Sequence, residues 1–68
     1  MPENQLTPSQ KLLAFFKYDH LPAHLQNISA PFGDLAQWME STLPDGAEKT
    51  TAMRKLLEAK DCAVRSTL

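Results

Sequence analysis

The sequence predicts an all-α fold, in which a short N-terminal helix precedes an antiparallel αα-hairpin. Apolar residues recur at spacings of three and four along the middle and C-terminal segments, which is the period of a helix and not of a strand. Turn signals rich in proline and glycine separate these segments from each other and from the N-terminal one. Together the two observations predict three helices in a single domain over residues 1–68.

The first helix is predicted over residues 7–17, after a disordered tail over residues 1–6. Thr7 can cap the helix, Pro8 suits its first position, and Gln10 completes a capping box three residues after the cap. The next apolar residues form a broad face: Leu12, Leu13, Phe15 and Phe16. A short helix with such a face has to pack against a larger element.

The second helix is predicted over residues 22–43, because Pro22 disfavours helix at Leu21 and suits a first turn. Its apolar positions follow spacings of 3, 4, 3, 4 and 4: Leu25, Ile28, Phe32, Leu35, Met39 and Leu43. Pro31 removes one backbone donor inside this segment. The apolar face keeps its phase across Pro31, so we expect one bent helix and not two.

The third helix is predicted over residues 46–67, after the turn signal at residues 43–46. Apolar residues again share one stripe: Ala52, Leu56, Ala59 and Ala63, widened by Met53, Leu57 and Val64. We expect the alanines to lie opposite Leu35, Trp38 and Met39 and to let the two helices approach closely. The short turn requires these helices to be antiparallel.

Length and composition restrict how such a fold becomes stable. A core of 68 residues rarely yields more than about 3–5 kcal/mol, so small domains usually add disulfides, a metal or a partner subunit. Cys62 is the only cysteine, and with His20 and His24 it offers too few ligands for a structural zinc site. We therefore expect no metal and no cofactor, and we expect homo-oligomerisation instead.

Charge and hydropathy exclude further classes. The formal net charge of −1 argues against a protein that coats nucleic acid, so no DNA partner is expected. No apolar run is long enough to cross a bilayer, and no signal segment precedes the first helix. We expect no membrane partner and a cytoplasmic location, which also suits a single unpaired cysteine.

Catalysis is not indicated, and we do not expect an enzyme. The chain has no nucleophile elbow, no metalloprotease motif and no glycine-rich phosphate loop. His20 and His24 are four residues apart, but Pro22 lies between them, so they straddle a helix start and do not form a metal pair. Cys62 lies among small apolar residues, where a packed core residue is the expected role.

The third helix carries polar residues with two interpretations. Arginines and acids alternate at spacings of 4, 3 and 4: Arg54, Glu58, Asp61 and Arg65. One interpretation is a solvated ladder of ion pairs, each contributing ~0.2–0.5 kcal/mol. In the other, Arg54 or Arg65 faces a subunit boundary and donates two parallel hydrogen bonds to a ligand phosphate. Lys49 and Thr50 near the start of the helix form a second candidate anion site.

The loop between the first two helices is the other candidate binding site. Lys17, Tyr18, His20 and Pro22 place a cation, two planar rings and a rigid apolar wall in one short segment. Aromatic faces stack on nucleobases with ~1–3 kcal/mol per base. In the alternative interpretation, Tyr18 and His20 only anchor the first helix to the hairpin.

A set of short segments between Phe16 and the C-terminus carries a resemblance to a known family. In chain order they are Tyr18-Asp19-His20-Leu21-Pro22, Ile28-Ser29-Ala30, Leu35-Ala36, Glu48-Lys49-Thr50, Ala52-Met53-Arg54-Lys55-Leu56 and Glu58-Ala59. In these segments the chain resembles the bacteriophage anti-CBASS cyclic-nucleotide sponges. It also resembles the wider group of short phage proteins that share their helical hairpin domain.

The resemblance implies a non-enzymatic protein that forms hexamers from interlocked dimers. Such proteins bind cyclic di- and trinucleotide signals of the host's defence and hold them intact, so that host effectors stay inactive. The dinucleotide pocket lies between two protomers and combines an aromatic residue of the loop with a basic residue of the long helix. Tyr18 matches the aromatic position. The basic position falls near the neutral Ser29, so the pocket is reshaped, uses Lys17 instead, or prefers another ligand.

The sequence therefore favours a sponge for cyclic oligonucleotides that works as a homo-oligomer, a dimer-based hexamer by resemblance. An alternative is a small helical adaptor or inhibitor, in which Phe16, Phe32 and Trp38 form an apolar groove for a partner helix. A DNA-binding regulator ranks lowest, because Glu58 and Asp61 offset the basic residues of the third helix.

Overall fold

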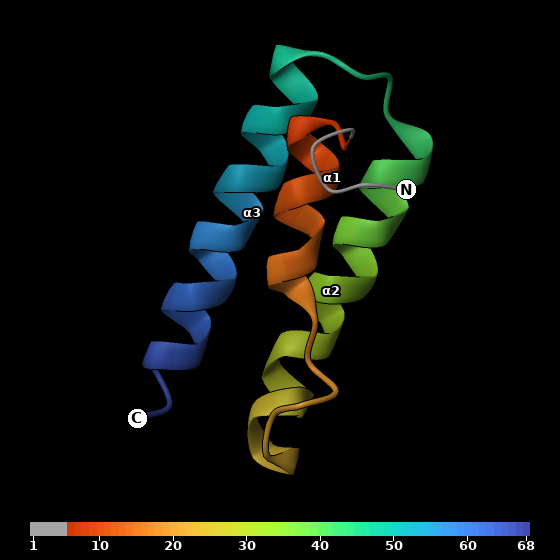
Figure 1. The fold of residues 1–68 in the computed structure, drawn as a ribbon. Coiled ribbons are helices and arrows are strands. Elements are labelled where there is room, and N and C mark those ends of the chain that lie inside the picture. The colour runs from red at the N-terminus through yellow and green to blue at the C-terminus, as the bar shows by residue number, and fades with distance from the viewer. Residues whose placement is uncertain (1–5) are drawn as a thin grey trace.

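The computed structural model describes residues 6–68, and Figure 1 shows the order of its elements. Four helical segments follow one another: α1 over Pro8–Leu13, the 3-10 turn η2 over Ala14–Phe16, α2 over Ala23–Thr42 and α3 over Ala47–Arg65. No strand occurs within residues 6–68, so the predicted all-α class with three helices is confirmed. The predicted tail lies outside the described residues, apart from Leu6.

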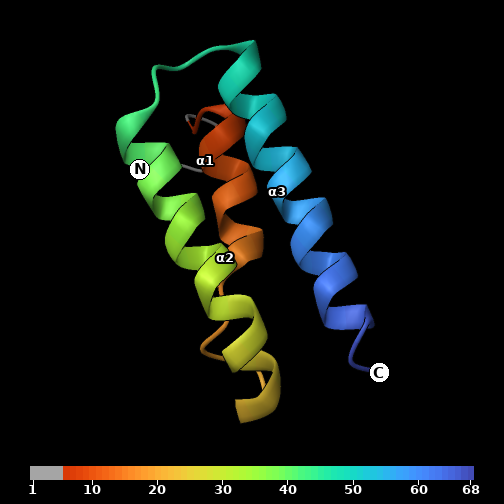
Figure 2. The ribbon, with the colours of Figure 1, turned by 180° about the vertical axis from the view of Figure 1, so that it is seen from behind.

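The two long helices, α2 and α3, run in opposite directions and are joined by a turn at one end of the molecule (Figure 1). α2 and α3 contact each other directly, α1 contacts both of them, and η2 contacts α2. Seen from behind, α2 passes in front of α1 (Figure 2), so the short segment covers one side of the α2–α3 pair. The core is therefore shared by all three helices.

Local sequence signals explain where α1 begins. Gln10 N donates to Thr7 Oγ1 at 3.2 Å, and Thr7 N donates to Gln10 Oε1 at 2.9 Å. This is the predicted capping box, with Pro8 at the first helical position, and it is confirmed. Because the two bonds satisfy backbone donors that have no partner in the helix, they stabilise the start of a very short helix.

The ends of the long helices follow from proline and glycine. α2 begins directly after Pro22 and continues through Pro31 as one helix, although Pro31 has no N–H to donate. α3 begins after Gly46, whose φ of 154° lies where side-chain-bearing residues are rarely found. Gly46 therefore lets the chain reverse direction between α2 and α3.

The buried apolar residues come from all three helical layers. Phe16 of η2, Ala36 of α2 and Met53 of α3 form the centre of the core. Larger, partly buried residues surround this centre: Leu12, Leu13, Phe32, Met39, Leu56 and Leu57. The most buried line on α2 is formed by small residues, namely Ser29, Gly33 and Ala36. The predicted face of large apolar residues thus borders the core and does not fill its centre.

The predicted contact between the alanines of α3 and the large residues of α2 does not form at Leu35, Trp38 and Ala59. Leu35 is 44% exposed, Trp38 is 56% exposed, and Ala59 is exposed as well, whereas Met39 packs against the core. The reason is that α1 and η2 also pack against α2, where Gly33 lies against the carbonyl oxygen of Phe16. Met53, and not an alanine, is the centre of the buried stripe of α3.

The end of η2 is held from both sides. A Cβ atom built on Gly33 would lie 3.0 Å from the carbonyl oxygen of Phe16, so only glycine permits this approach without a shift. From α3, Lys60 Nζ donates to the carbonyl oxygen of Phe15 at 2.7 Å and lies 5.7 Å from the centroid of the Phe16 ring. The lysine thus combines a hydrogen bond to a helix C-terminus with a cation–π contact.

Gly33→Val should lower the free energy of unfolding by about 1–3 kcal/mol, because the new side chain would displace η2 from α2. Valine has no lower helix propensity than glycine, so the loss reports the contact and not the propensity. Denaturant unfolding at a fixed protein concentration measures it. Lys55→Val, at an exposed site of α3, is the control and should change stability by at most about 0.5 kcal/mol. Equal losses in the two variants would contradict the close-contact explanation.

Candidate functional site

A groove of about 560 Å³ lies where the loop after η2 crosses α2. Its apolar floor comes from α1, η2 and Gly33. Six polar or aromatic side chains line the rest: Gln10, Lys17, Tyr18, Asp19, Asp34 and Gln37. An open apolar hollow with a few convergent polar groups is the usual setting of a ligand site.

Tyr18 is the central side chain of this groove. Its ring is half-buried, and its Oη donates to Asp34 Oδ1 at 3.4 Å, a long hydrogen bond. The chain leaves η2 in an extended conformation at Lys17, which directs Tyr18 along α2. The hydrogen bond to Asp34 therefore places the ring beside α2, where it lines the groove.

The loop that carries Tyr18 is fixed to the first turns of α2. Gln26 Nε2 donates to the carbonyl oxygen of Leu21 at 2.7 Å and to that of Asp19 at 3.3 Å. Leu21 N donates to the carbonyl oxygen of Tyr18 at 3.1 Å, which closes a turn. These bonds satisfy main-chain groups that a loop leaves open, so the groove has an ordered wall.

Only some residues of the predicted loop site line the groove. Lys17 and Tyr18 line the groove, whereas His20 and Pro22 are exposed farther along the loop and do not line it. Three groove residues, Gln10, Asp34 and Gln37, were not expected from the sequence. The absent side chain of Gly33 opens the space beside them, and a glycine inside a helical pattern was the one local signal.

The groove of a single chain is acidic. Lys17 contributes one cation, and Asp19 and Asp34 contribute two carboxylates. In the described part of the chain, no basic nitrogen lies within 4.0 Å of either carboxylate. An anionic ligand bound here would therefore need additional basic groups from outside this chain.

A second hollow of about 450 Å³ lies where the start of α1 meets the start of α3. Thr50, Thr51 and Arg54 line it on the α3 side, and Thr7 lines it on the α1 side. Figure 1 places this end of the molecule away from the loop over residues 17–22. Thr50 and Arg54 are thus not brought together with Tyr18 within one chain.

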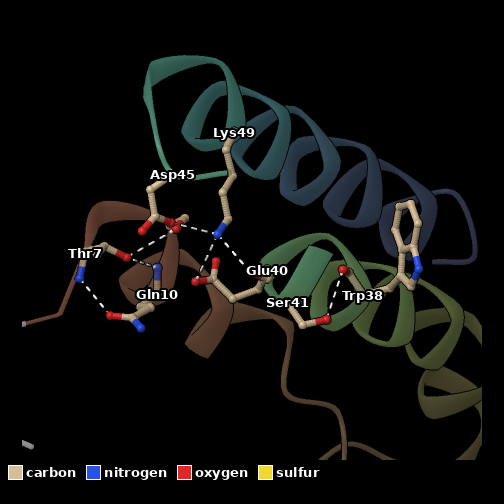
Figure 3. Close-up of polar contacts among 8 residues, drawn as sticks. Thr7, Gln10, Trp38, Glu40, Ser41, Asp45 and Lys49 are labelled. Atoms are coloured by element: carbon tan, nitrogen blue, oxygen red, sulfur yellow. Dashed lines mark hydrogen bonds and ion pairs between the residues drawn. The ribbon is translucent and has the colours of Figure 1, made fainter. Parts of the chain in front are cut away.

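Lys49 is buried in a polar cluster between α2, the turn and α3 (Figure 3). It is 5% exposed, and its Nζ donates to the carbonyl oxygen of Glu40 at 2.8 Å and to Asp45 Oδ1 at 2.9 Å. Glu40 Oε1 lies 3.4 Å from the same nitrogen. Lys49 thereby joins the last turn of α2 to the first turn of α3, and it is not free to bind a ligand.

The hydrogen bond to Asp45 raises the pKa of Lys49 above its ordinary value of 10.5. Burial opposes this shift, and the hydrogen bond and charge of Glu40 add to it. The second oxygen of Glu40, Oε2, is buried without a hydrogen-bond partner. The positive charge of Lys49 is therefore what compensates a largely buried carboxylate.

Ser29 is likewise inside the fold. It is 1% exposed, and its Oγ has no hydrogen-bond partner. Ser29, Gly33 and Ala36 form the line of small residues on the buried side of α2. The side chain therefore serves the close packing of α2 and cannot reach a ligand on the surface of this chain.

The predicted ladder of ion pairs among Arg54, Glu58, Asp61 and Arg65 does not form. Glu58 pairs with Lys55 at 3.8 Å, and Asp61 pairs with Lys60 at 3.7 Å, so neither acid pairs with an arginine. Arg54 has no carboxylate within 4.0 Å among residues 6–68. Arg65 Nη2 donates to Cys62 Sγ at 3.3 Å, which leaves its remaining donors exposed.

The expectation that Cys62 is a packed core residue is wrong, because its side chain is exposed. Cys62 follows Met53 by nine positions, and at about 100° per residue this places it on the opposite side of α3. Since Met53 is at the centre of the core, Cys62 faces outward.

Comparison of the chain with protein-family models, with curated proteins and with solved structures found no match. No helix within residues 6–68 is both long enough and apolar enough to cross a bilayer. In the same residues, no three side chains of His, Cys, Asp or Glu converge as metal ligands. The geometry of the Tyr18 groove is therefore the main structural guide to function.

Lys49→Met should destabilise the fold, because it retains the aliphatic stem but removes the charge that compensates Glu40. Since folding raises the pKa of Lys49, its contribution is complete below pH 10.5 and is lost as pH rises through the raised pKa. Denaturant unfolding at several pH values should show the difference between wild type and variant shrinking above pH 10.5. Lys55→Met, at an exposed site, is the control. A pH-independent difference would argue against this ion-pair account.

Ser29→Ala should raise the free energy of unfolding by about 0.5–1 kcal/mol, since it removes a buried hydroxyl without a partner and favours helix. Thermal unfolding measures the gain. Ser41→Ala, at an exposed position of α2, controls for helix propensity and should give a smaller gain. A loss of stability in Ser29→Ala would mean that the hydroxyl has a partner.

Proposed function

We propose that this protein is a non-enzymatic sponge that sequesters cyclic di- or trinucleotide immune signals and so blocks host anti-phage defence. The observation that carries the proposal is the groove that the half-buried Tyr18 and the exposed Lys17 line together. The groove holds no arrangement of nucleophile, base and orienting group. Its residues are suited to binding a planar, charged ligand.

The two side chains would contact different parts of the ligand. A nucleobase stacked on the Tyr18 ring would gain about 1–3 kcal/mol, whichever base it is. Lys17 is exposed at the rim of the groove and is free to pair with a phosphate oxygen. The hydrogen bonds of Gln26 fix the loop before binding, which lowers the entropic cost of ordering it.

A homo-oligomer would complete the site. Each groove carries one cation and two carboxylates, so a ligand with two phosphates requires basic groups from a second copy. Arg54 and Arg65 are exposed and have no carboxylate partner among residues 6–68, so both are available as donors. Thr50, at the rim of the second hollow, would add a hydroxyl. Lys49 and Ser29 are excluded from the proposed site because both are buried.

The small core also favours assembly. Only Phe16, Ala36 and Met53 are fully buried apolar residues in the described chain. Three large apolar side chains remain exposed on the helices: Phe15, Leu35 and Trp38. We propose that copies of the chain cover part of this surface in a dimer-based hexamer, working in the host cytoplasm, as the sequence resemblance implies.

A protein-binding adaptor is the second candidate. The groove of Phe16, Phe32 and Trp38 expected from the sequence is not open to a partner, because Phe16 is buried and Phe32 packs against the core. Leu35 and Trp38 are instead exposed on one face of α2, three residues apart, which is the spacing of a helical recognition face. An adaptor would leave the Tyr18 groove empty. The two candidates therefore differ in whether a small ligand stabilises the protein.

A thermal-shift panel of cyclic di- and trinucleotides tests the proposal. At a ligand concentration of about a hundred times the Kd, stabilisation is about 2.7 kcal/mol, which raises the Tm of so small a domain by several degrees. Tyr18→Ala should abolish the shift and leave the oligomer intact in native mass spectrometry. Tyr18→Phe keeps the stacking face and should retain most of the shift.

Two outcomes count against the sponge. A flat panel with a folded wild-type protein would shift support to the adaptor. A full shift in Tyr18→Ala would place the ligand outside the Tyr18 groove.

A further inference from the structure

Asp34 has unused hydrogen-bonding capacity at the end of the Tyr18 ring. It is exposed on α2, and Oδ1 accepts one long hydrogen bond, of 3.4 Å, from Tyr18 Oη. An ionised carboxylate accepts at about four lone-pair positions, so most of its capacity remains open to a ligand. No lysine, arginine or histidine nitrogen within residues 6–68 pairs with it.

The position of this carboxylate relative to the ring sets what it can recognise. A base stacked on Tyr18 lies parallel to the ring, and a base edge that extends past the hydroxyl end of the ring reaches Asp34, which accepts from Oη. The edge of the base would therefore meet two acceptor oxygens. Gln10 and Gln37 also line the groove, but each amide offers both donors and acceptors and so does not by itself distinguish bases.

We infer that Asp34 makes the groove select guanine over adenine; the inference rests on the proposed function. The Watson–Crick edge of guanine presents two adjacent donors, N1–H and N2–H₂, which match the two oxygens of a carboxylate. Adenine presents its N6–H₂ donor beside the N1 acceptor, so one carboxylate oxygen would face a lone pair. A bidentate pair of this kind discriminates roughly 5- to 150-fold between bases.

The charged residues of the groove would contact different parts of the ligand. Lys17 at the rim is placed for the phosphate, while Asp34 lies on α2 at the end of the ring. Asp19, the other carboxylate of the groove, has no hydrogen bond to Tyr18. It therefore serves as a matched control, since it carries the same charge in the same groove without the contact to the ring.

Calorimetric titration of the full chain with cyclic di-GMP and cyclic di-AMP tests the inference. The two probes have the same cyclic sugar–phosphate backbone and the same charge, and they differ only in the base. Cyclic di-GMP should bind at least about 5-fold more tightly. Asp34→Asn presents one donor and one acceptor in place of two acceptors, and it should remove or reverse this preference. Asp19→Asn should keep the preference.

A third probe separates the two hydrogen bonds. The inosine analogue of cyclic di-GMP lacks the 2-amino group but keeps N1–H, so its affinity should lie between those of the guanine and adenine ligands. Equal binding of guanine and adenine ligands by wild type, or loss of the preference in both asparagine variants, would overturn the role of Asp34 and leave the sponge intact. Absence of binding by every cyclic nucleotide would overturn the proposed function itself.

Discussion

The position of η2 on α2 depends on the close contact between Phe16 and Gly33. The ring of Phe16 is buried in the core, and its carbonyl oxygen occupies space that any side chain at position 33 would fill. Lys60 holds the same turn from α3 through the carbonyl oxygen of Phe15. A helix as short as α1 is unstable alone in water, so these contacts and the Thr7 capping box keep it helical.

The candidate groove is a consequence of this packing. Because η2 ends against α2, the chain emerges extended at Lys17 and brings Tyr18 beside Asp34, which directly follows Gly33. Gln26 then fixes the rest of the loop on the first turns of α2. The same glycine thus permits the close packing and leaves the floor of the groove open.

The basic residues of the chain have different roles that charge counts do not reveal. Lys49 and Lys60 hold structural elements together through backbone carbonyls, one at each end of the fold. Lys17 and Arg54 remain at the surface beside hollows. A charged ligand would therefore depend on how copies of the chain bring their surface cations together.

The sequence by itself determined the all-α class, the capping box at Thr7 and the reversal at Gly46, because these signals act within a few residues of the chain. It did not determine which side of α2 is buried, since spacing shows that apolar residues share a face but not which neighbour covers them. The packing of α1 and η2 against α2 decided this, placing small residues inside and Trp38 outside. Only the tertiary structure could bury Lys49 against Glu40 and set Asp34 beside Tyr18, because each contact joins a helix to a separate segment of the chain.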